Sequence, residues 1–342
     1  MKGLVYLSGE YQDLPLGELR GALRSMSSDL KIQEDRRPLI ITDRPPHPDL
    51  AKRMGHCHFT GEIQYSCDPD INDIKRAVEE LLVDISKNES VSFRVKSTAR
   101  SKELTSGNIF VQLEERLIRG PWKLRHRSPI CKFFVVTDGG SAYIGWINSE
   151  TDRSSLLSRR GPQMPYNRPV GMDPRMARAM TNLLGIPKGK VILDPFMGPG
   201  GLIMEAAILG YKCIGIERDP EILRGAEDNI LFTGLDDTIE TNLGDCRNII
   251  PEIIGKGERG LDCILTDPPF GKGSSTNGME PLELMAEALG KAYNGLKKGS
   301  PVVFDTNDPE IHDKLEGYSV REVYPIRVHR SMTRYIIRME RK

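Results

Sequence analysis

From about residue 170 onward, strand-like runs alternate with helix-like runs, and this alternation leaves few folds open to the chain. The strand-like runs are KVILD, KCIGIE, IETNLGD, LDCILTD and SPVVFDT, and the helix-like runs include GGLIMEAAILG, DPEILRGAEDNILFTG and PLELMAEALGKAYNGL. Strands joined through helices are parallel, and the helices then cover both faces of the sheet. We therefore predict an α/β domain over residues 170–342 with a doubly wound, mostly parallel sheet. The final run, REVYPIRVHRSMTRYIIRMER, predicts two more strands that add an antiparallel edge.

The residues before 170 predict a different, α+β organisation. Short strands and helices follow one another up to about residue 85, and DPDINDIKRAVEELLVDI predicts a helix with Asp70 as its N-cap. A second small unit is predicted over residues 86–151, where SVSFRVKSTAR alternates apolar and polar residues like a strand with a basic outer face. Residues 152–169 are rich in Ser, Arg and Pro and are predicted to be a linker.

The net charge is zero, but the charges are unevenly distributed along the chain. Residues 94–132 contain ten Lys or Arg and three Asp or Glu, whereas residues 214–262 contain twelve acids and five bases. A basic half joined to an acidic half favours a polyanionic partner for the first half, although charge runs also mark ordinary solvated surfaces.

Other features of the composition exclude several classes of protein. The chain contains no apolar run of 18 residues, so no membrane span is expected, and its first residues do not resemble a signal peptide. The six cysteines are scattered without a C-x-x-C pair, and several lie within apolar runs. We therefore expect reduced cysteines, no metal site and a cytoplasmic location.

The stretch VILDPFMGPGGLIMEAA joins a strand to a helix through a glycine-rich turn. Asp194 ends the strand, and Gly198, Gly200 and Gly201 allow a ligand to approach the backbone and the first amides of the helix. The dinucleotide fingerprint G-x-G-x-x-G fails here because Ile203 occupies the third glycine position. An acid at the strand end suits a sulfonium or amino group better than a pyrophosphate, so the turn favours S-adenosylmethionine over NAD.

Two further acids stand at the predicted ends of the next strands. Glu217 follows the glycine turn by about twenty residues, where a carboxylate accepts hydrogen bonds from ribose hydroxyls. Asp245 is placed to accept from the amino group of adenine, or alternatively serves as a turn or cap residue. Asp219, just beyond Glu217, is predicted to cap the following helix.

The stretch ILTDPPFGKG ends the fourth strand with an acid, two prolines and an aromatic ring. An exocyclic base amine is a poor nucleophile, and the Asp267 carboxylate with the Pro268 carbonyl can accept its two N–H bonds. Phe270 offers a flat face on which the base can stack. The prolines stiffen this corner, because each fixes φ and lacks an amide donor. The stretch therefore predicts a site that aims an aromatic amine at a methyl donor.

With DPFMGPGG and TDPPFGKG together, the chain resembles the amino-methyltransferases, which use S-adenosylmethionine on exocyclic amines of bases. RPVGMDPRMARAMTNL and RVHRSMTR extend the resemblance to the archaeal and eukaryotic tRNA guanine-N2 methyltransferases that modify guanine ten. The resemblance implies a Rossmann-like methyltransferase domain, a THUMP RNA-binding domain over 86–151 and a ferredoxin-like domain over 1–85. It also implies a monomeric enzyme that acts on tRNA by direct methyl transfer, without a metal or a covalent intermediate.

The resemblance assigns roles to individual residues of this sequence. Asp194, Gly198 and Gly200 would line the methionine part of the cofactor, Glu217 the ribose and Asp245 the adenine. Phe196, Arg218, Cys246 and Asp267 are further candidates for cofactor contacts, while Asp267, Pro268 and Phe270 would hold the guanine. Candidates for contacts with tRNA phosphates are Arg94, Lys96, Arg100, Lys102, Lys123, Arg125, Arg127 and Lys272.

Three alternatives remain open at this stage. The same chemistry could act on DNA adenine or on guanine in ribosomal RNA. The chain could instead be a non-catalytic RNA-binding protein, which the intact series of strand-end acids and D-P-P-F disfavours. An NAD oxidoreductase is disfavoured by the missing third glycine.

Overall fold

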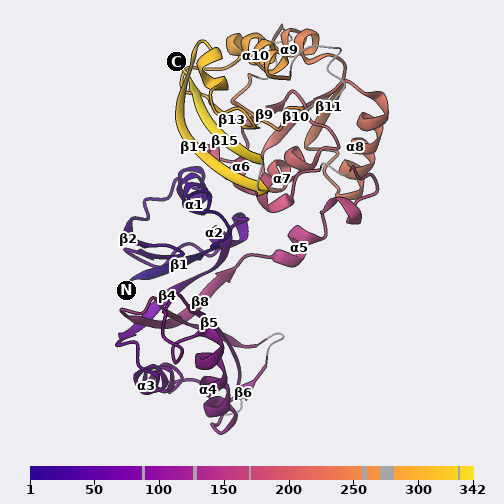
Figure 1. Ribbon diagram of the computed structural model, residues 1–342. Coiled ribbons are helices and arrows are strands. Elements are labelled where there is room, and N and C mark those ends of the chain that lie inside the picture. Colours follow the sequence, from indigo (N-terminus) through magenta and orange to yellow (C-terminus); the bar gives the residue numbers. More distant parts are fainter. Residues whose placement is uncertain (87–88, 126–128, 169–170, 256–259, 270–280, 330–331) are drawn as a thin grey trace. The chain divides into compact units, whose positions relative to one another are not determined.

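The computed structural model of the chain describes residues 1–86, 89–125, 129–168, 171–255, 260–269, 281–329 and 332–342 (Figure 1). Their contacts form two compact units. The N-terminal unit contains residues 1–9, 29–52 and 57–151, and the C-terminal unit contains residues 10–28, 53–56 and 152–342.

The N-terminal unit is built on one eight-stranded sheet of order β2-β3-β1-β4-β8-β7-β5-β6. Its strands are β1 (Gly3–Leu7), β2 (Ile32–Arg36), β3 (Leu39–Thr42), β4 (Cys57–Cys67), β5 (Ser90–Ser97), β6 (Lys123–Leu124), β7 (Cys131–Thr137) and β8 (Ala142–Glu150). The pairs are antiparallel except that β5 is parallel to β6 and β7. The sheet is continuous across residue 85; the division into ferredoxin-like and THUMP domains stays a prediction.

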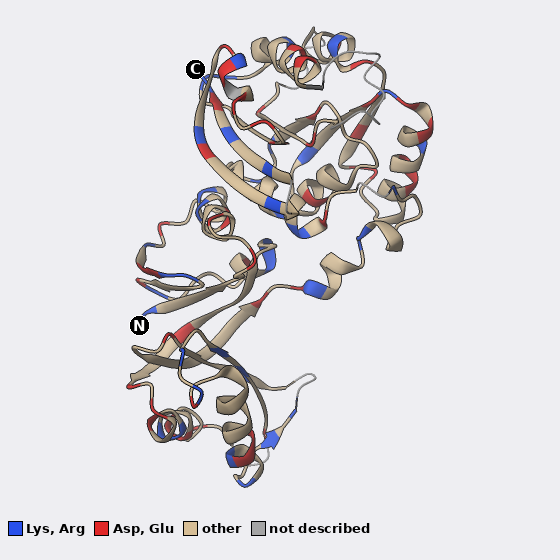
Figure 2. Ribbon diagram, in the orientation of Figure 1, with Lys and Arg blue, Asp and Glu red and all other residues tan. Residues whose placement is uncertain are grey.

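Helices α3 (Ile71–Leu81) and α4 (Ser106–Ile118) pack against this sheet, α3 on β4 and β8 and α4 on β5. The predicted cap of α3 is confirmed, because the Asp70 carboxylate accepts from the amides of Asn72 at 2.8 Å and Asp73 at 3.3 Å. A short helix, α2 (Asp49–Arg53), precedes β4. Helices α3 and α4 both carry acids as well as bases (Figure 2).

The C-terminal unit contains a seven-stranded sheet of order β11-β10-β9-β12-β13-β15-β14. Its strands are β9 (Val191–Asp194), β10 (Lys212–Glu217), β11 (Ile239–Leu243), β12 (Cys263–Thr266), β13 (Pro301–Thr306), β14 (Tyr318–His329) and β15 (Met332–Arg341). The first five strands in this order are parallel, and β15 and β14 add the antiparallel edge drawn in yellow in Figure 1. The predicted doubly wound sheet and its antiparallel edge are confirmed.

Helices cover both faces of this sheet. They are α6 (Pro174–Leu183), α7 (Gly201–Ile208), α8 (Pro220–Phe232), α9 (Cys246–Gly255) and α10 (Pro281–Ala292), with a short α5 (Arg153–Leu157) before them. Ile192 packs with α6, α7 and α8 in one core, whereas its neighbour Leu193 packs with α9 and α10 in the other. Successive side chains of β9 therefore point to opposite faces of the sheet, and both faces are buried. The sequence-based prediction did not include α9.

One helix from the beginning of the chain belongs to the C-terminal unit. Helix α1 (Leu14–Ser25) packs so closely on α6 that a Cβ on Gly21 would lie 2.2 Å from the Asn182 carbonyl oxygen. The buried Glu18 carboxylate accepts from the amides of Gly55 at 2.6 Å and His56 at 2.9 Å, and from the Asn182 side chain at 3.0 Å. These contacts make residues 10–28 and 53–56 part of the C-terminal core.

Candidate active site

The candidate active site lies at the carboxyl edge of the C-terminal sheet. Strands β10 and β12 flank β9 and run parallel to it, so their last residues share one edge. The chain reverses its winding direction between β9 and β12, and ligands bind at such a switch point. Asp194, Glu217, Asp245 and Asp267 all end strands or follow them directly at this edge, as the sequence predicts.

The glycine turn after β9 has the conformation that its sequence predicts. Gly198 has φ +52° and Gly200, the N-cap of α7, has φ +84°, a region that side chains with a Cβ rarely adopt. A Cβ built on Gly198 meets no atom within 4 Å, so this turn presents bare backbone to open space. Such a surface admits the close approach of a ligand.

Asp194 is a buried acid with an unsatisfied oxygen. One carboxylate oxygen accepts from the Phe196 amide at 3.0 Å and from the Thr266 hydroxyl at 2.6 Å. The other oxygen is buried and has no hydrogen-bond partner among the described residues. Burial, opposed by those hydrogen bonds and aided by Asp267 and Glu217, raises the pKa of Asp194 to about 7. A positively charged ligand group beside Asp194 would relieve this cost, since buried charges require a partner.

Glu217 organises the turns around it through backbone hydrogen bonds. Its carboxylate accepts from the amides of Gly198 at 3.1 Å, Arg218 at 2.7 Å and Asp219 at 2.8 Å. It therefore ties the glycine turn to the end of β10. Asp219 caps α8 as predicted, accepting from the amides of Glu221 at 2.8 Å and Ile222 at 3.3 Å.

Asp245 lies directly before α9 and pairs with an arginine that the sequence-based prediction missed. The guanidinium of Arg247 lies 2.6 Å from one Asp245 oxygen, and this contact lowers the pKa of Asp245. The same arginine reaches Glu287 on α10 at 3.2 Å. The next residue in the chain after Asp245, Cys246, is buried, and burial raises its pKa to about 12.

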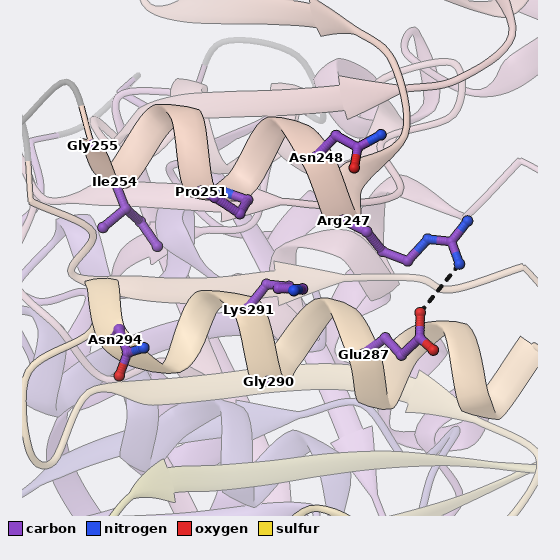
Figure 3. A pocket seen from close by; sticks show the side chains of 9 residues that line it. All are labelled: Arg247, Asn248, Pro251, Ile254, Gly255, Glu287, Gly290, Lys291 and Asn294. Carbon is purple, nitrogen blue, oxygen red and sulfur yellow. Dashed lines mark hydrogen bonds and ion pairs between the residues drawn. The ribbon is translucent and has the colours of Figure 1, made fainter.

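A hollow of about 880 Å³ lies between α9 and α10, with the Arg247–Glu287 pair spanning it at one end (Figure 3). It is lined by Arg247, Asn248, Pro251, Ile254, Gly255, Glu287, Gly290, Lys291 and Asn294. None of the predicted site residues lines this hollow.

Asp267 enters an unforeseen ion-pair cluster. Arg334 donates from one nitrogen to Asp267 at 2.6 Å and to Asp305 at 2.8 Å. We call Asp194, Asp267, Asp305 and Arg334 the edge cluster. Pro268 is buried beside it. The predicted residues Phe270 and Lys272 lie outside the described residues.

The predicted phosphate-binding residues lie on the N-terminal unit, and two of them have other partners. Arg94 donates to Glu150 at 3.0 Å, and the Lys96 ammonium lies 5.8 Å from the centre of the Tyr6 ring. Arg100, Lys102, Lys123 and Arg125 are exposed. Arg127 lies outside the described residues. Their contact with tRNA stays a prediction.

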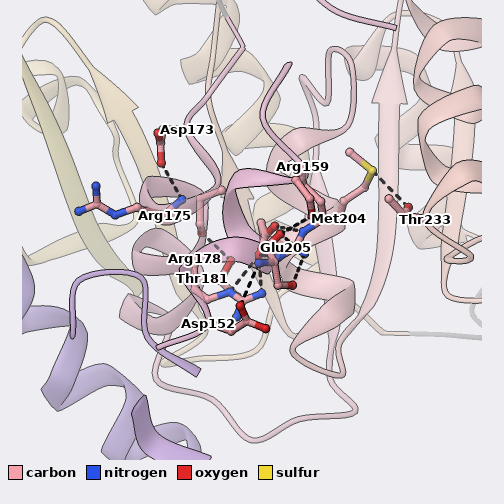
Figure 4. A network of polar contacts seen from close by, with 12 residues as sticks. Asp152, Arg159, Asp173, Arg175, Arg178, Thr181, Met204, Glu205 and Thr233 are labelled. Atoms are coloured by element: carbon pink, nitrogen blue, oxygen red, sulfur yellow. Dashed lines mark hydrogen bonds and ion pairs between the residues drawn. The ribbon is translucent and has the colours of Figure 1, made fainter. Parts of the chain in front are cut away.

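Residues 152–168, predicted to be a linker, pack onto the C-terminal unit, and we call them the strap. The buried Glu205 carboxylate on α7 pairs with Arg159 of the strap at 2.6 Å and with Arg178 of α6 at 2.5 Å (Figure 4). We call these three residues the Glu205 clamp.

The strap also reaches the glycine turn through Asn229, a buried residue of α8. The Asn229 side chain accepts from the Tyr166 amide at 2.9 Å, and donates to the carbonyl oxygens of Tyr166 at 3.0 Å and Pro199 at 3.1 Å. The Tyr166 ring leaves no space for a Cβ on Gly225. The strap is therefore joined to the loop that follows β9.

The described residues contain neither a candidate membrane span nor a candidate metal site. None of their helices has the length and apolarity to cross a bilayer. No three of their His, Cys, Asp and Glu side chains gather in a way that could hold a metal ion.

Comparison with known families shows to which family the chain belongs. A family model described as UPF0020, an RMKL-like methyltransferase domain, matches residues 163–336, just over half of the chain. This chain belongs to that methyltransferase family. The matched region contains the glycine turn, all four strand-end acids and the edge cluster.

Proteins similar to this methyltransferase over its whole length are known in archaea and bacteria. A tRNA (guanine(10)-N2)-dimethyltransferase of Methanothermobacter thermautotrophicus is 31% identical, with all of both chains covered. One of Pyrococcus abyssi is 29% identical over 90% of this chain and 91% of its own. The crystal structure of TrmN from Thermus thermophilus is 20% identical with a TM-score of 0.62, and covers both chains fully, which supports the same fold.

Proposed function

We propose that this methyltransferase transfers methyl groups from S-adenosylmethionine to the exocyclic N2 amine of guanine 10 in tRNA. The observation that carries the proposal is the placement of Asp267 beside the glycine turn. Asp194 accepts from Thr266, the residue directly before Asp267, at 2.6 Å. A site for the methyl donor and an acceptor for the amine are thus neighbours on one sheet edge. The names of the full-length archaeal relatives support guanine 10 as the target and two methyl groups as the product.

The residues at the sheet edge fit S-adenosylmethionine. When bound, this cofactor supplies a methyl group on a positively charged sulfur. The unsatisfied oxygen of Asp194 offers a negative partner for a cationic part of it. Gly198 leaves the space that a bulky ligand needs. Glu217 would accept from ribose hydroxyls through lone pairs that its backbone contacts do not use, since a carboxylate has about four acceptor positions.

Asp267 would orient the target amine. Its carboxylate and the Pro268 carbonyl accept the two N–H bonds of the guanine N2 group, which directs the nitrogen lone pair toward the methyl group. The same carboxylate is placed to take the proton that the methylated nitrogen must lose. Guanine 10 lies within folded RNA, so the base must leave its stack to reach this edge.

The N-terminal unit would bind the tRNA backbone as a THUMP-containing RNA-binding region. Ten of the Lys and Arg residues lie between 94 and 132, against three acids. Neutralisation of phosphates by these cations predicts binding that weakens with salt, by about 0.7 to 0.9 in log affinity per unit of log salt for each phosphate neutralised. We propose that the enzyme acts as a monomer in the cytoplasm.

The test is the identity of the modified nucleoside. The full chain is incubated with an unmodified tRNA transcript and isotopically labelled S-adenosylmethionine, and the digested tRNA is analysed by mass spectrometry. We expect N2,N2-dimethylguanosine from position 10, and no label in a transcript whose G10 pair is replaced by A–U. Label in methyladenine, or transfer only to ribosomal RNA, would overturn the proposal.

A further inference from the structure

The edge cluster forms because β15 runs opposite to its neighbours. β12 and β13 are parallel, and Thr266 of β12 lies beside Phe304 of β13. The next residue after Thr266 is Asp267 and the next after Phe304 is Asp305, so these two acids share the carboxyl edge. β15 pairs with β13 in the antiparallel sense, so its beginning lies at that same edge. Arg334, near the start of β15, thereby reaches both acids.

The contacts of Arg334 are close and largely shielded from water. One guanidinium nitrogen lies 2.6 Å from Asp267 and 2.8 Å from Asp305. The side chains of Arg334 and Asp267 are 24% and 23% exposed, and that of Asp305 is only 5% exposed. Charge interactions at such sites are much stronger than those on a surface.

Among the described residues, the acids of the edge cluster outnumber the cations that pair with them. Asp194 on β9 and Asp305 on β13 both interact unfavourably with the charge of Asp267, and Glu217 on β10 adds to the charge near Asp194. Arg334 opposes this repulsion for both Asp267 and Asp305. Burial raises the pKa of Asp267 and raises that of Asp305 to about 7, while Arg334 lowers both.

An acid that must accept strongly from an amine and then take its proton has to be ionised, since a protonated carboxyl is a weaker acceptor and already carries the proton. We propose that Arg334 is a positioning residue that keeps Asp267 charged and fixes its orientation, with Asp305 as the anchor of the guanidinium. Arg334 binds one oxygen of Asp267, and the second oxygen then faces the amine as an acceptor. The catalytic meaning of this arrangement rests on the proposed function, but the charge state of Asp267 does not.

The direct test is the titration of Asp267 in the full chain, followed by carboxyl carbon NMR and assigned by comparison with Asp267→Asn. In Arg334→Met we expect the pKa of Asp267 to rise by about one to three units, the effect of removing an adjacent arginine. Arg334→Lys keeps a charge and should give a smaller rise. Asp305→Asn removes a neighbouring negative charge and should lower the pKa of Asp267. The proposal is overturned if Asp267 titrates as in the wild type in both Arg334 variants.

A matched control separates this role from simple support of the sheet. Arg338 lies on the same strand, is also buried, and pairs with Glu340 at 2.8 Å. Arg338→Met should leave the titration of Asp267 unchanged, and an equal shift in this variant would overturn the specific role of Arg334.

The pH profile of methyl transfer connects the charge state to turnover. The acidic limb of kcat/KM should move to higher pH in Arg334→Met by the same amount as the NMR titration, and should stay in place in Arg338→Met. A shifted titration with an unshifted limb would show that Asp267 is not the acceptor and would count against the proposed function alone. An unshifted titration counts against Arg334 whatever the substrate is.

Discussion

The edge cluster and the Glu205 clamp are both largely buried groups of charges, but acids are in excess in the edge cluster and arginines are in excess in the clamp. In the clamp, one carboxylate is held by two guanidinium groups at 2.6 and 2.5 Å. In the edge cluster, the Arg334 guanidinium pairs with two carboxylates, and the third acid, Asp194, keeps an oxygen that has no partner among the described residues. Burial raises the pKa of both Asp194 and Asp305 to about 7. The clamp is saturated with partners and joins α6, α7 and the strap. The edge cluster keeps acceptors available, which is what a site for cationic and amine ligands requires.

The largest effect is expected from breaking the clamp. Glu205→Ala would leave the buried Arg178 and the partly buried Arg159 without their carboxylate and should lower the free energy of unfolding of the C-terminal unit by about 3–5 kcal/mol. Urea denaturation measures this. Glu287→Ala, which removes an exposed partner of Arg247, is the control and should cost at most about 1 kcal/mol. Equal losses in the two variants would refute the distinction.

Removing Asp267 from the edge cluster should affect chemistry more than folding. Asp267→Ala should lower kcat by about 10²–10³-fold, the scale for loss of one preorganised electrostatic group. Cofactor affinity measured by calorimetry should be nearly unchanged, because this acid acts on the amine. Asp262→Ala, before the start of the same strand where it pairs with Lys190, is the control and should retain activity. Wild-type turnover in Asp267→Ala would contradict the proposed role.

The raised pKa of Asp305 in the edge cluster should make the stability of the protein depend on pH. A folded pKa of about 7 for Asp305 exceeds the value near 4 expected in the unfolded chain, so the folded state binds the proton more tightly. Its stabilising contribution is present below pH 4 and is lost as pH rises toward 7. Between pH 5 and 7 the unfolding free energy of the wild type should fall more steeply than that of Asp305→Asn, by up to about 1.4 kcal/mol per pH unit. Parallel curves from urea titrations at several pH values would disprove this.

The smallest effect is expected where the strap meets the glycine turn. Asn229→Ala removes three hydrogen bonds and frees the Pro199 and Tyr166 backbone, so cofactor affinity should fall about fivefold, which corresponds to about 1 kcal/mol. Glu227→Ala, an exposed change on the same helix, should leave the affinity unchanged. If calorimetry gives equal affinities for both variants, the strap supports folding only.

The sequence predicted which acids the parallel strands bring to one edge. Asp194, Glu217 and Asp267 lie at that edge as expected, because each directly ends or follows an apolar strand. Their roles toward the cofactor and the guanine stay predictions. The glycine turn was found because positive φ demands glycine. These signals are local and periodic, so they are visible without tertiary structure.

The missed parts depend on long-range contacts. Arg334 lies 67 positions from Asp267, and it reaches that acid only because β15 is antiparallel to β13. Arg159 meets Glu205 46 positions away, so a stretch rich in Ser, Arg and Pro was interpreted as a linker. Helix α9 was missed because Pro251 lies inside it, and an internal proline normally argues against a helix. In each case the feature depends on tertiary contacts, which the pattern of neighbouring residues in the sequence does not show.

The membership of α1 in the C-terminal core has a consequence for how this protein is made. Residues 10–28 leave the ribosome long before α6, whose surface they cover, has been synthesised. Early folding of the N-terminal part, which is usual during translation, must therefore leave α1 waiting with its apolar face uncovered. The C-terminal unit cannot complete its core until residues on both sides of the N-terminal sheet have been synthesised, so a fragment of residues 170–342 lacks one of the helices that pack in that core.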